Sequence, residues 1–233
     1  GNDVSGNNND YTSSGLAADD QVSDTPTKNF CILNTLAKNL STLSNGNLNV
    51  VSYSGTYDDI VSGTIFPSNG KWYWECEAQG VVVDYPKIGI LPVDLLGING
   101  YLGSTALPDS IAYNANGVVY ENSATIATYS TYTNGDVIGV ALDLDNGTLY
   151  YSKNDTFENS SDPAAGTNPV KTGLTGTWGP CFGGYSTRRV TNVNFGQTAF
   201  AGTIPVGFKA LNTANLATPT ITDGTANFQT TLY

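Results

Sequence analysis

Hydrophobic and polar residues alternate most regularly over residues 137–144 (VIGVALDL). One set of alternate positions carries large aliphatic side chains, namely Ile138, Val140, Leu142 and Leu144. A second apolar run, residues 148–152, follows the tripeptide Asp145-Asn146-Gly147. Alternation with a period of two predicts strands, and Asn-Gly accepts the positive φ angles of a tight reversal. The pattern therefore predicts a β-hairpin that buries its aliphatic face.

Further short strands are predicted elsewhere, and no stretch has a convincing helical period. They cover residues 47–52, 71–78, 87–91, 111–113, 118–121, 178–182 and 190–195. In residues 71–78 (KWYWECEA), Trp72 and Trp74 share one face, whereas Glu75 and Glu77 lie on the other. We expect this strand to be half-buried, with both tryptophans in the core. The predicted fold class is all-β, with many short strands joined by turns.

The composition of the chain argues against nucleic acid and membrane partners. Of the 233 residues, 39% are hydrophobic, which is enough for a core, and the net charge is −11. An acidic surface repels phosphate backbones, so we expect no nucleic acid partner. No apolar run reaches the roughly 18–20 residues needed to cross a bilayer, so we expect no membrane insertion. The three cysteines are widely spaced, which favours buried free thiols. The absence of Met predicts a processed product, a trimmed chain or part of a longer chain.

Residues suited to catalysis are scarce. The sequence has no His, which is the commonest general base, and no GxSxG, Walker or CxxC motif. Two carboxylate pairs remain, Glu75 with Glu77 and Asp143 with Asp145. We interpret the first pair as solvated side chains on a strand and the second as acceptors for turn amides. We therefore expect no enzyme, no cofactor and no metal site, and interpret Asp3, Asn7, Asn9 and Asp10 as a polar turn rather than calcium ligands.

Residues suited to binding are more abundant. The chain has 14 tyrosines, and several lie in predicted loops. Tyrosine offers a large contact face at modest entropic cost and a hydroxyl for polar ligands, whether sugars or proteins. Arg188 and Arg189 are the only arginines, and in an extended chain they point to opposite faces, so at most one joins a given site. The predicted ligand-binding residues are Tyr101, Tyr129, Tyr132, Tyr185 and Arg188.

Four motifs resemble a SPRY domain in their order and spacing. They are GKWYWE at residues 70–75, IGI at 88–90, NGDVIGVALDLDNGTLYYSKN at 134–154 and VNFGQTAF at 193–200. The resemblance covers residues 30–208 and implies a bent sandwich of two antiparallel sheets, in agreement with the strand pattern. Residues 1–29 would form a polar N-terminal arm, and residues 209–233 a C-terminal tail or linker.

The flanks resemble segments that border SPRY modules in tail-fibre and appendage proteins of marine bacteriophages. These flanks are DVSGNNNDY at residues 3–11, DTPTKNF at 24–30 and GFKALNTANLATPTI at 207–221. The likeness implies a virion structural protein on the particle surface, whose arm is the end of a preceding concanavalin-like domain. Its expected partners are a host surface glycan or protein, other virion proteins or copies of itself. The alternatives are an architectural capsid decoration or fibre spacer without a receptor, and a calcium-dependent lectin-like module.

Overall fold

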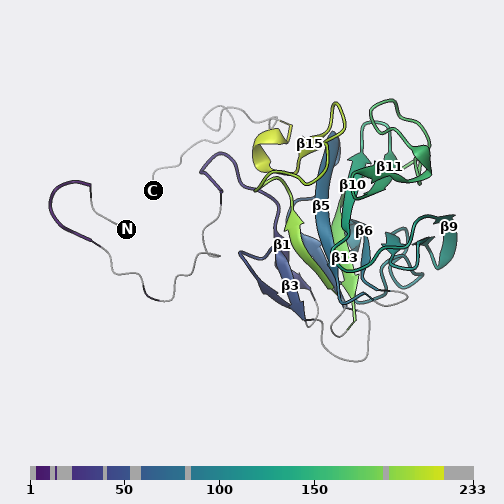
Figure 1. Cartoon of the computed structure of the whole chain (residues 1–233), viewed down its shortest axis with the longest axis horizontal. Helices are drawn as coiled ribbons and strands as arrows, with labels where there is room; N and C mark the ends of the chain where they lie inside the picture. Colours follow the sequence, from purple (N-terminus) through teal and green to yellow (C-terminus); the bar gives the residue numbers. More distant parts are fainter. Residues whose placement is uncertain are drawn as a thin grey trace, which may run out of the picture.

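The computed structural model describes residues 4–10, 14, 23–38, 41–52, 59–81, 85–185 and 189–217. Two large sheets pack face to face in this part of the chain (Figure 1). Helical structure among these residues is limited to three short 3₁₀ turns: η2 (Val93–Leu95), η3 (Glu158–Ser160) and η4 (Thr213–Asn215). The predicted all-β sandwich is confirmed.

The first sheet has seven strands in the order β1-β4-β13-β6-β7-β8-β9, and all neighbours are antiparallel. Their bounds are β1 (Leu33–Lys38), β4 (Asp59–Gly63), β13 (Trp178–Gly184), β6 (Lys87–Pro92), β7 (Ile111–Asn114), β8 (Val118–Glu121) and β9 (Ala124–Thr128). The sequence pattern missed β1, β4 and β9. The run that contains β9 is rich in Thr and Ser and lacks the apolar alternation that marks the other strands.

The second sheet has the order β12-β11-β10-β5-β14, and β15 adds to β5 in parallel. Its strands are β5 (Lys71–Gln79), β10 (Val137–Asp143), β11 (Thr148–Lys153), β12 (Thr156–Phe157), β14 (Arg189–Asn194) and β15 (Lys209–Ala210). A separate pair joins β2 (Thr42–Ser44) to β3 (Asn49–Ser52). The central strand β5 thus pairs with β10, β14 and β15.

The predicted hairpin is confirmed as β10 and β11, in which Asp143 faces Thr148 across the turn. The Asp143 carboxylate accepts hydrogen bonds from the backbone amides of Asp145 and Asn146, each at 3.0 Å. Asp145 in turn accepts a hydrogen bond from the backbone amide of Gly70 at 2.7 Å. Both aspartates therefore fix turn backbone, as the sequence predicted.

The inner faces of the two sheets form the main core. Trp72 and Trp74 are almost fully buried there, so their predicted core position is confirmed. The three cysteines are buried free thiols, as the sequence analysis predicted. Burial raises the pKa of the Cys31 thiol to about 11, because the thiolate would lose its hydration.

One expectation about β5 is wrong. The strand is not half-buried, because residues 197–210 cover the face opposite the tryptophans (Figure 1). Tyr73 is 1% exposed and Glu75 is 3% exposed, so Glu75 is not a solvated side chain. Phe200 packs edge-on against Tyr73 at 5.1 Å between ring centroids, and Phe208 joins the same cluster. A distant segment supplies this cover, so the local pattern of the strand could not indicate it.

Two segments that flank the sandwich in the sequence, residues 29–31 and 211–213, pair with each other. Phe30 and Asn212 form an isolated bridge, and the amide of Cys31 donates to the carbonyl of Leu211 at 2.9 Å. The amide of Thr213 donates to the carbonyl of Asn29 at 2.9 Å. The paired body therefore extends past residue 208 to Thr213.

A tyrosine-lined pocket as the candidate binding site

The outer face of the seven-stranded sheet is partly covered by the loop between β6 and β7. Leu102 and Leu107 of this loop are buried in a small cluster with sheet residues such as Ala112. Gly103 allows the loop to lie this close to the sheet. Its φ is +82°, and a Cβ atom there would lie 2.9 Å from the carbonyl oxygen of Tyr120. The loop therefore packs closely against the sheet at Gly103.

A pocket of about 350 Å³ lies beside this loop. We call it the tyrosine pocket; its lining residues are Tyr85, Lys87, Tyr101, Leu102, Gly103, Ser104, Asn114, Tyr120 and Ser123. Lys87 of β6 and Asn114 of β7 are direct neighbours in the sheet register. Three adjacent strands, β6, β7 and β8, thus contribute lining side chains, and the covering loop contributes Tyr101 to Ser104. The site is therefore built on rigid sheet and completed by a loop.

Aromatic rings surround the single charged side chain of the lining. The Lys87 ammonium lies 5.0 Å from the ring centroid of Tyr85 and 5.2 Å from that of Tyr101. Such distances give a cation–π attraction that helps to fix the rings. Tyr185 packs on Tyr85 with centroids 5.8 Å apart, and Tyr101 is 46% exposed. The structure thus brings together two of the predicted site residues, Tyr101 and Tyr185, through Tyr85 and Lys87.

The other two predicted tyrosines lie elsewhere. Tyr132 is 3% exposed, and its hydroxyl donates to the carbonyl oxygens of Pro86 at 2.5 Å and Tyr113 at 3.0 Å. Tyr129 packs edge-on against Tyr113 at 5.8 Å between centroids. Burial raises the pKa of Tyr132 well above its usual value and that of Tyr129 to about 12. These two rings pack on the interior rather than line the tyrosine pocket; Arg188 lies outside the described residues.

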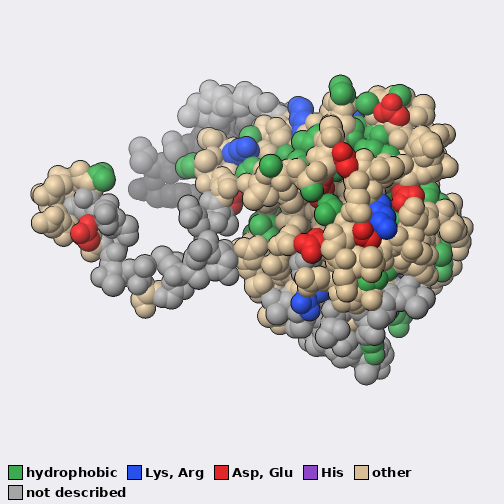
Figure 2. Space-filling view, viewed as in Figure 1, with side chains coloured by type: hydrophobic (Ala, Val, Ile, Leu, Met, Phe, Trp, Pro, Cys, Tyr) green, Lys and Arg blue, Asp and Glu red, His purple; other side chains and the backbone are tan. Residues whose placement is uncertain are grey.

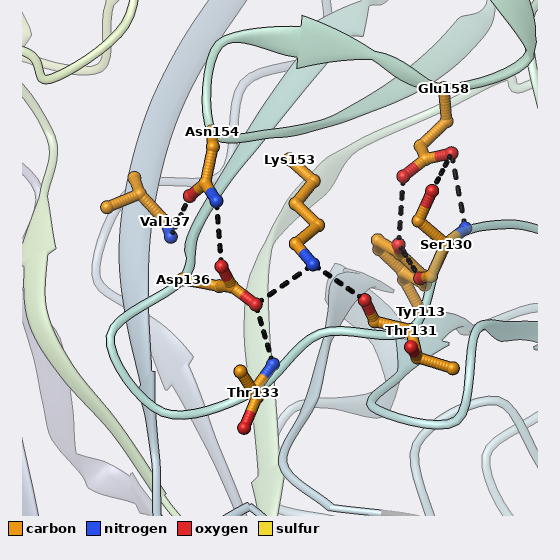
Figure 3. Close-up of polar contacts among 9 residues, drawn as sticks. All are labelled: Tyr113, Ser130, Thr131, Thr133, Asp136, Val137, Lys153, Asn154 and Glu158. Atoms are coloured by element: carbon orange, nitrogen blue, oxygen red, sulfur yellow. Dashed lines mark hydrogen bonds and ion pairs between the residues drawn. The ribbon is translucent and has the colours of Figure 1, made fainter.

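A polar network holds the loop that carries these two tyrosines (Figure 3). Lys153 forms an ion pair with Asp136 at 3.0 Å and donates to the carbonyl oxygen of Thr131 at 2.8 Å. Glu158 accepts hydrogen bonds from the backbone and hydroxyl of Ser130, each at 3.2 Å. Burial would raise the pKa of Asp136, but the hydrogen bonds and Lys153 outweigh it and lower that pKa. The network fixes the loop to the end of the β10–β11 hairpin.

Asn114 is one of the pocket residues that the sequence analysis did not select. It is 3% exposed and its side-chain oxygen is fully buried, yet within the described structure no group donates a hydrogen bond to it. Buried polar atoms are usually paired, and the Asn114 oxygen is an exception that it shares with the Trp74 indole nitrogen and the Tyr150 hydroxyl. In the sequence Asn114 begins the turn Asn114-Ala115-Asn116-Gly117, so its local pattern indicated only a turn.

The carboxylates considered for catalysis are held in structural contacts. Glu75 accepts hydrogen bonds from the backbone amides of Ala201 and Gly202 and from the Tyr73 hydroxyl, each at 2.8 Å. Glu77 accepts one from the Asn192 amide at 2.8 Å. Among the described residues there is no group of three or more His, Cys, Asp or Glu side chains that could hold a metal ion. A helix long and apolar enough to span a bilayer is likewise missing from that part of the chain.

The surface around these elements carries little charge of either sign. Acidic and basic side chains are scattered singly over the face shown in Figure 2, among uncharged ones. This agrees with the 12% of charged residues in the sequence. Contacts on such a surface depend on shape, hydrogen bonds and aromatic rings more than on long-range electrostatic steering.

Comparison with known proteins shows which domain this chain resembles. Residues 71–162 match the model of the SPRY domain. The fold is similar to the SPRY domain of human HERC1, with a TM-score of 0.54 and 18% identity over 72% of this chain and 99% of that one. It is also similar to the PSpry domain of TRIM65, with a TM-score of 0.52 and 14% identity over 70% and 88% of the two chains. The SPRY domain expected from the motifs is thereby confirmed.

Two further comparisons mark the extent of the likeness. The stonustoxin structure matches with a TM-score of 0.50 and 20% identity over 70% of this chain. The matched region is 27% of that chain, so this protein spans about a quarter of the stonustoxin chain. A comparison with curated protein sequences gives no match.

Proposed function

We propose that this chain is a non-enzymatic binding module and that the tyrosine pocket is its contact site for a partner. SPRY domains generally mediate protein–protein interactions, which supports the binding role. The observation that carries the proposal is the pocket itself, where the exposed ring of Tyr101 and the rings of Tyr85 and Tyr120 converge on one rigid sheet face. Pockets with aromatic walls and a few convergent polar groups are the usual form of binding sites.

The non-enzymatic part of the proposal rests on the chemistry of the available side chains. The sequence has no His, and the Glu75 carboxylate is enclosed by backbone amides. Asp143 is bound to turn amides and to Lys71 at 2.9 Å. Glu75 and Asp143 are therefore both buried and held in structural hydrogen bonds, which withdraws them from solvent and substrate.

The location of the module follows from the flanking segments. Residues 3–11, 24–30 and 207–221 resemble segments of marine bacteriophage appendage proteins. We place the module in a virion structural protein, on the particle surface. Its partner would be a host surface receptor, either a glycan or a protein, or a neighbouring virion protein. The architectural alternative, a decoration or spacer without a receptor, differs because it needs no open pocket.

Adsorption of the purified chain to a panel of marine bacterial cells tests the proposal. Tyr101→Ala and Tyr185→Ala should each weaken adsorption about tenfold, since an aromatic anchor at an interface contributes more than about 1 kcal/mol. Tyr129→Phe is the matched control, because its ring packs on Tyr113 outside the pocket, and it should adsorb like the parent. Equal adsorption by all variants would favour the architectural alternative, and release of soluble fragments from cell polysaccharide would contradict the non-enzymatic role.

A further inference from the structure

We infer that Asn99 is a site of spontaneous deamidation, and that this reaction alters the loop that lines the tyrosine pocket. The modification itself is independent of the proposed function, whereas its effect on binding rests on that function. The chain has six Asn-Gly pairs, and hydrogen bonds protect all of them except Asn99-Gly100. The six pairs begin at Asn45, Asn69, Asn99, Asn116, Asn134 and Asn146.

Deamidation of asparagine begins with a reaction inside the chain. The backbone nitrogen of the next residue attacks the side-chain carbonyl carbon, and a C–N bond forms. The attacking nitrogen loses its proton to water, and the side-chain nitrogen takes up a proton and leaves as ammonia. Water then opens the cyclic succinimide at either carbonyl, which gives aspartate or isoaspartate. Glycine in the second position favours the attack because it has no side chain to shield its nitrogen.

The attack requires two parts of the chain to move. The asparagine side chain must rotate, and the peptide group that follows must turn its nitrogen toward that side chain. The carbonyl of the asparagine and the amide of the glycine belong to one rigid peptide unit, so they turn together. A hydrogen bond to the side chain, to this carbonyl or to this amide must therefore break before the reaction.

Three of the pairs are protected through the asparagine side chain. The side-chain oxygens of Asn116 and Asn134 accept hydrogen bonds from backbone amides at 2.9 Å and 2.8 Å. The amide of Gly135 also donates to a carbonyl oxygen of β5 at 3.0 Å. The side-chain nitrogen of Asn146 donates to the Asp143 carboxylate at 2.8 Å. None of these side chains can approach the following nitrogen without losing a hydrogen bond.

Two further pairs are protected through the peptide group. The amide of Gly70 donates to the Asp145 carboxylate at 2.7 Å, and the carbonyl oxygen of Asn69 accepts from an indole N–H at 2.8 Å. The half-buried Asn45 lies in the turn between β2 and β3, where its carbonyl oxygen accepts from the amide of Leu48 at 3.0 Å. Both peptide groups are thus fixed in orientation.

Asn99 differs from the other five in all these respects. It is exposed in the loop between β6 and β7. Within the described structure, its side chain, its carbonyl oxygen and the amide of Gly100 form no hydrogen bond. The packing of the loop also requires the glycine, because a Cβ atom at Gly100 would lie 2.9 Å from Cγ of Leu107. The loop therefore contains a reactive pair that nothing holds in place.

The product changes the wall of the tyrosine pocket. Asn99 precedes Tyr101 by two residues, and the 46% exposed ring of Tyr101 lies 5.2 Å from the Lys87 ammonium. Aspartate or isoaspartate adds a negative charge to this loop at neutral pH. Isoaspartate also lengthens the backbone by one carbon, which shifts the residues that follow. We expect the reacted chain to bind its partner less tightly.

The test of the modification is incubation of the full chain at mildly alkaline pH, followed by peptide mapping with mass spectrometry. Asn99 should react at least about fivefold faster than each other Asn-Gly asparagine, since those sites must first break a hydrogen bond. In denaturant the six rates should converge, because the protecting hydrogen bonds are absent. An equally fast reaction at a second pair in the folded chain, or the same preference in denaturant, would overturn the inference.

Two variants test the cause of the difference. Asn99→Gln keeps a carboxamide, but its longer side chain must form a larger ring, so residue 99 should stay unmodified. Asp145→Ala releases the amide of Gly70 and should speed the reaction at the exposed Asn69. An unchanged rate at Asn69 would show that hydrogen bonds do not protect these pairs, which would overturn the inference.

Adsorption to cells tests the effect on the pocket. Incubated parent chain should lose adsorption in proportion to the fraction deamidated at Asn99, whereas Asn99→Gln treated in the same way should keep it. Deamidation without loss of adsorption would overturn the effect on the pocket and leave the modification established. If fresh parent chain does not adsorb, the proposed function fails, and the mass spectrum still decides whether Asn99 reacts.

Discussion

The outer faces of the two sheets are covered to different degrees. On the six-stranded sheet, residues 197–210 lie across β5 and enclose an aromatic cluster, and the Glu75 carboxylate fastens them by two backbone amides. On the seven-stranded sheet, the loop between β6 and β7 covers part of the face, and the tyrosine pocket lies beside Gly103 of this loop. The first face is closed by a distant segment, whereas the second keeps an open pocket.

The difference shows which side chains have structural roles and which are available for binding. Glu75 and Asn114 are both 3% exposed, so burial alone does not separate them. Glu75 accepts three hydrogen bonds, whereas the oxygen of Asn114 accepts none within the described structure. The hydrogen bonds to a distant segment, rather than low exposure alone, thus indicate the structural role of Glu75.

The largest expected effect is on the closed face. Glu75→Ala should lower the free energy of unfolding by about 4 kcal/mol, because two backbone amides and the Tyr73 hydroxyl lose a charged acceptor. Chemical denaturation measures this loss. Glu77→Ala is the matched control, since Glu77 is more exposed and accepts a hydrogen bond from the Asn192 side chain, so the change should cost less than about 1 kcal/mol. Similar losses in both variants would mean that residues 197–210 are held by packing alone.

A glycine substitution tests how closely the loop packs on the open face. Gly103→Ala should cost about 3 kcal/mol, because the new Cβ adds a clash with Tyr120 and Ala112 to the strain of a positive φ. Gly97→Ala shares the positive φ but has no atom within 4 Å of the new Cβ, so it should cost about 1 kcal/mol. Thermal unfolding of both variants gives the comparison. Equal costs would show that the loop can shift away from the sheet.

The tyrosines predicted from the sequence should separate into two groups. Tyr132→Phe should lower the free energy of unfolding by about 1–2 kcal/mol, because the carbonyls of Pro86 and Tyr113 lose a buried donor. Tyr101→Phe removes a hydroxyl from an exposed side chain and should change stability by less than about 0.5 kcal/mol. Urea titrations distinguish the two, and a reversed order would contradict the assignment of Tyr132 to the interior.

The smallest expected effect is a dependence of stability on pH. Burial would raise the pKa of Asp143, but hydrogen bonds from Asn146 and the contact with Lys71 outweigh it, so that pKa is lowered, as is that of Asp136. A lowered folded-state pKa stabilises the protein above the unfolded pKa of about 4, and this stability is lost as the pH falls through the folded pKa. The melting temperature should therefore fall below about pH 4.

Substitutions locate the origin of that pH dependence. Asp136→Asn should make the melting temperature depend less on pH below about pH 4. The change removes Asp136, which together with Asp143 has a lowered pKa (Figure 3). If the melting temperature of Asp136→Asn still falls with pH as it does in the parent, other carboxylates cause the pH dependence.

The sequence by itself determined most of the strands, the hairpin of β10 and β11, and the burial of Trp72 and Trp74. These features depend on alternation, turn residues and side-chain size, which act over a few neighbouring residues. It also selected Tyr101 and Tyr185 as rings in loops, but the same criterion selected Tyr129 and Tyr132, which pack on the interior.

Only the tertiary structure decided which polar residues are satisfied and which are left open. Residues 197–210 cover Glu75 from far along the chain, and Tyr132 turns inward to bond Pro86. The sequence around Asn114 indicated only a turn. Asn114 lines the pocket because β6 and β8 pair on either side of β7 and the loop between β6 and β7 lies beside them. Such placements depend on contacts between distant segments, and no local pattern of residues records them.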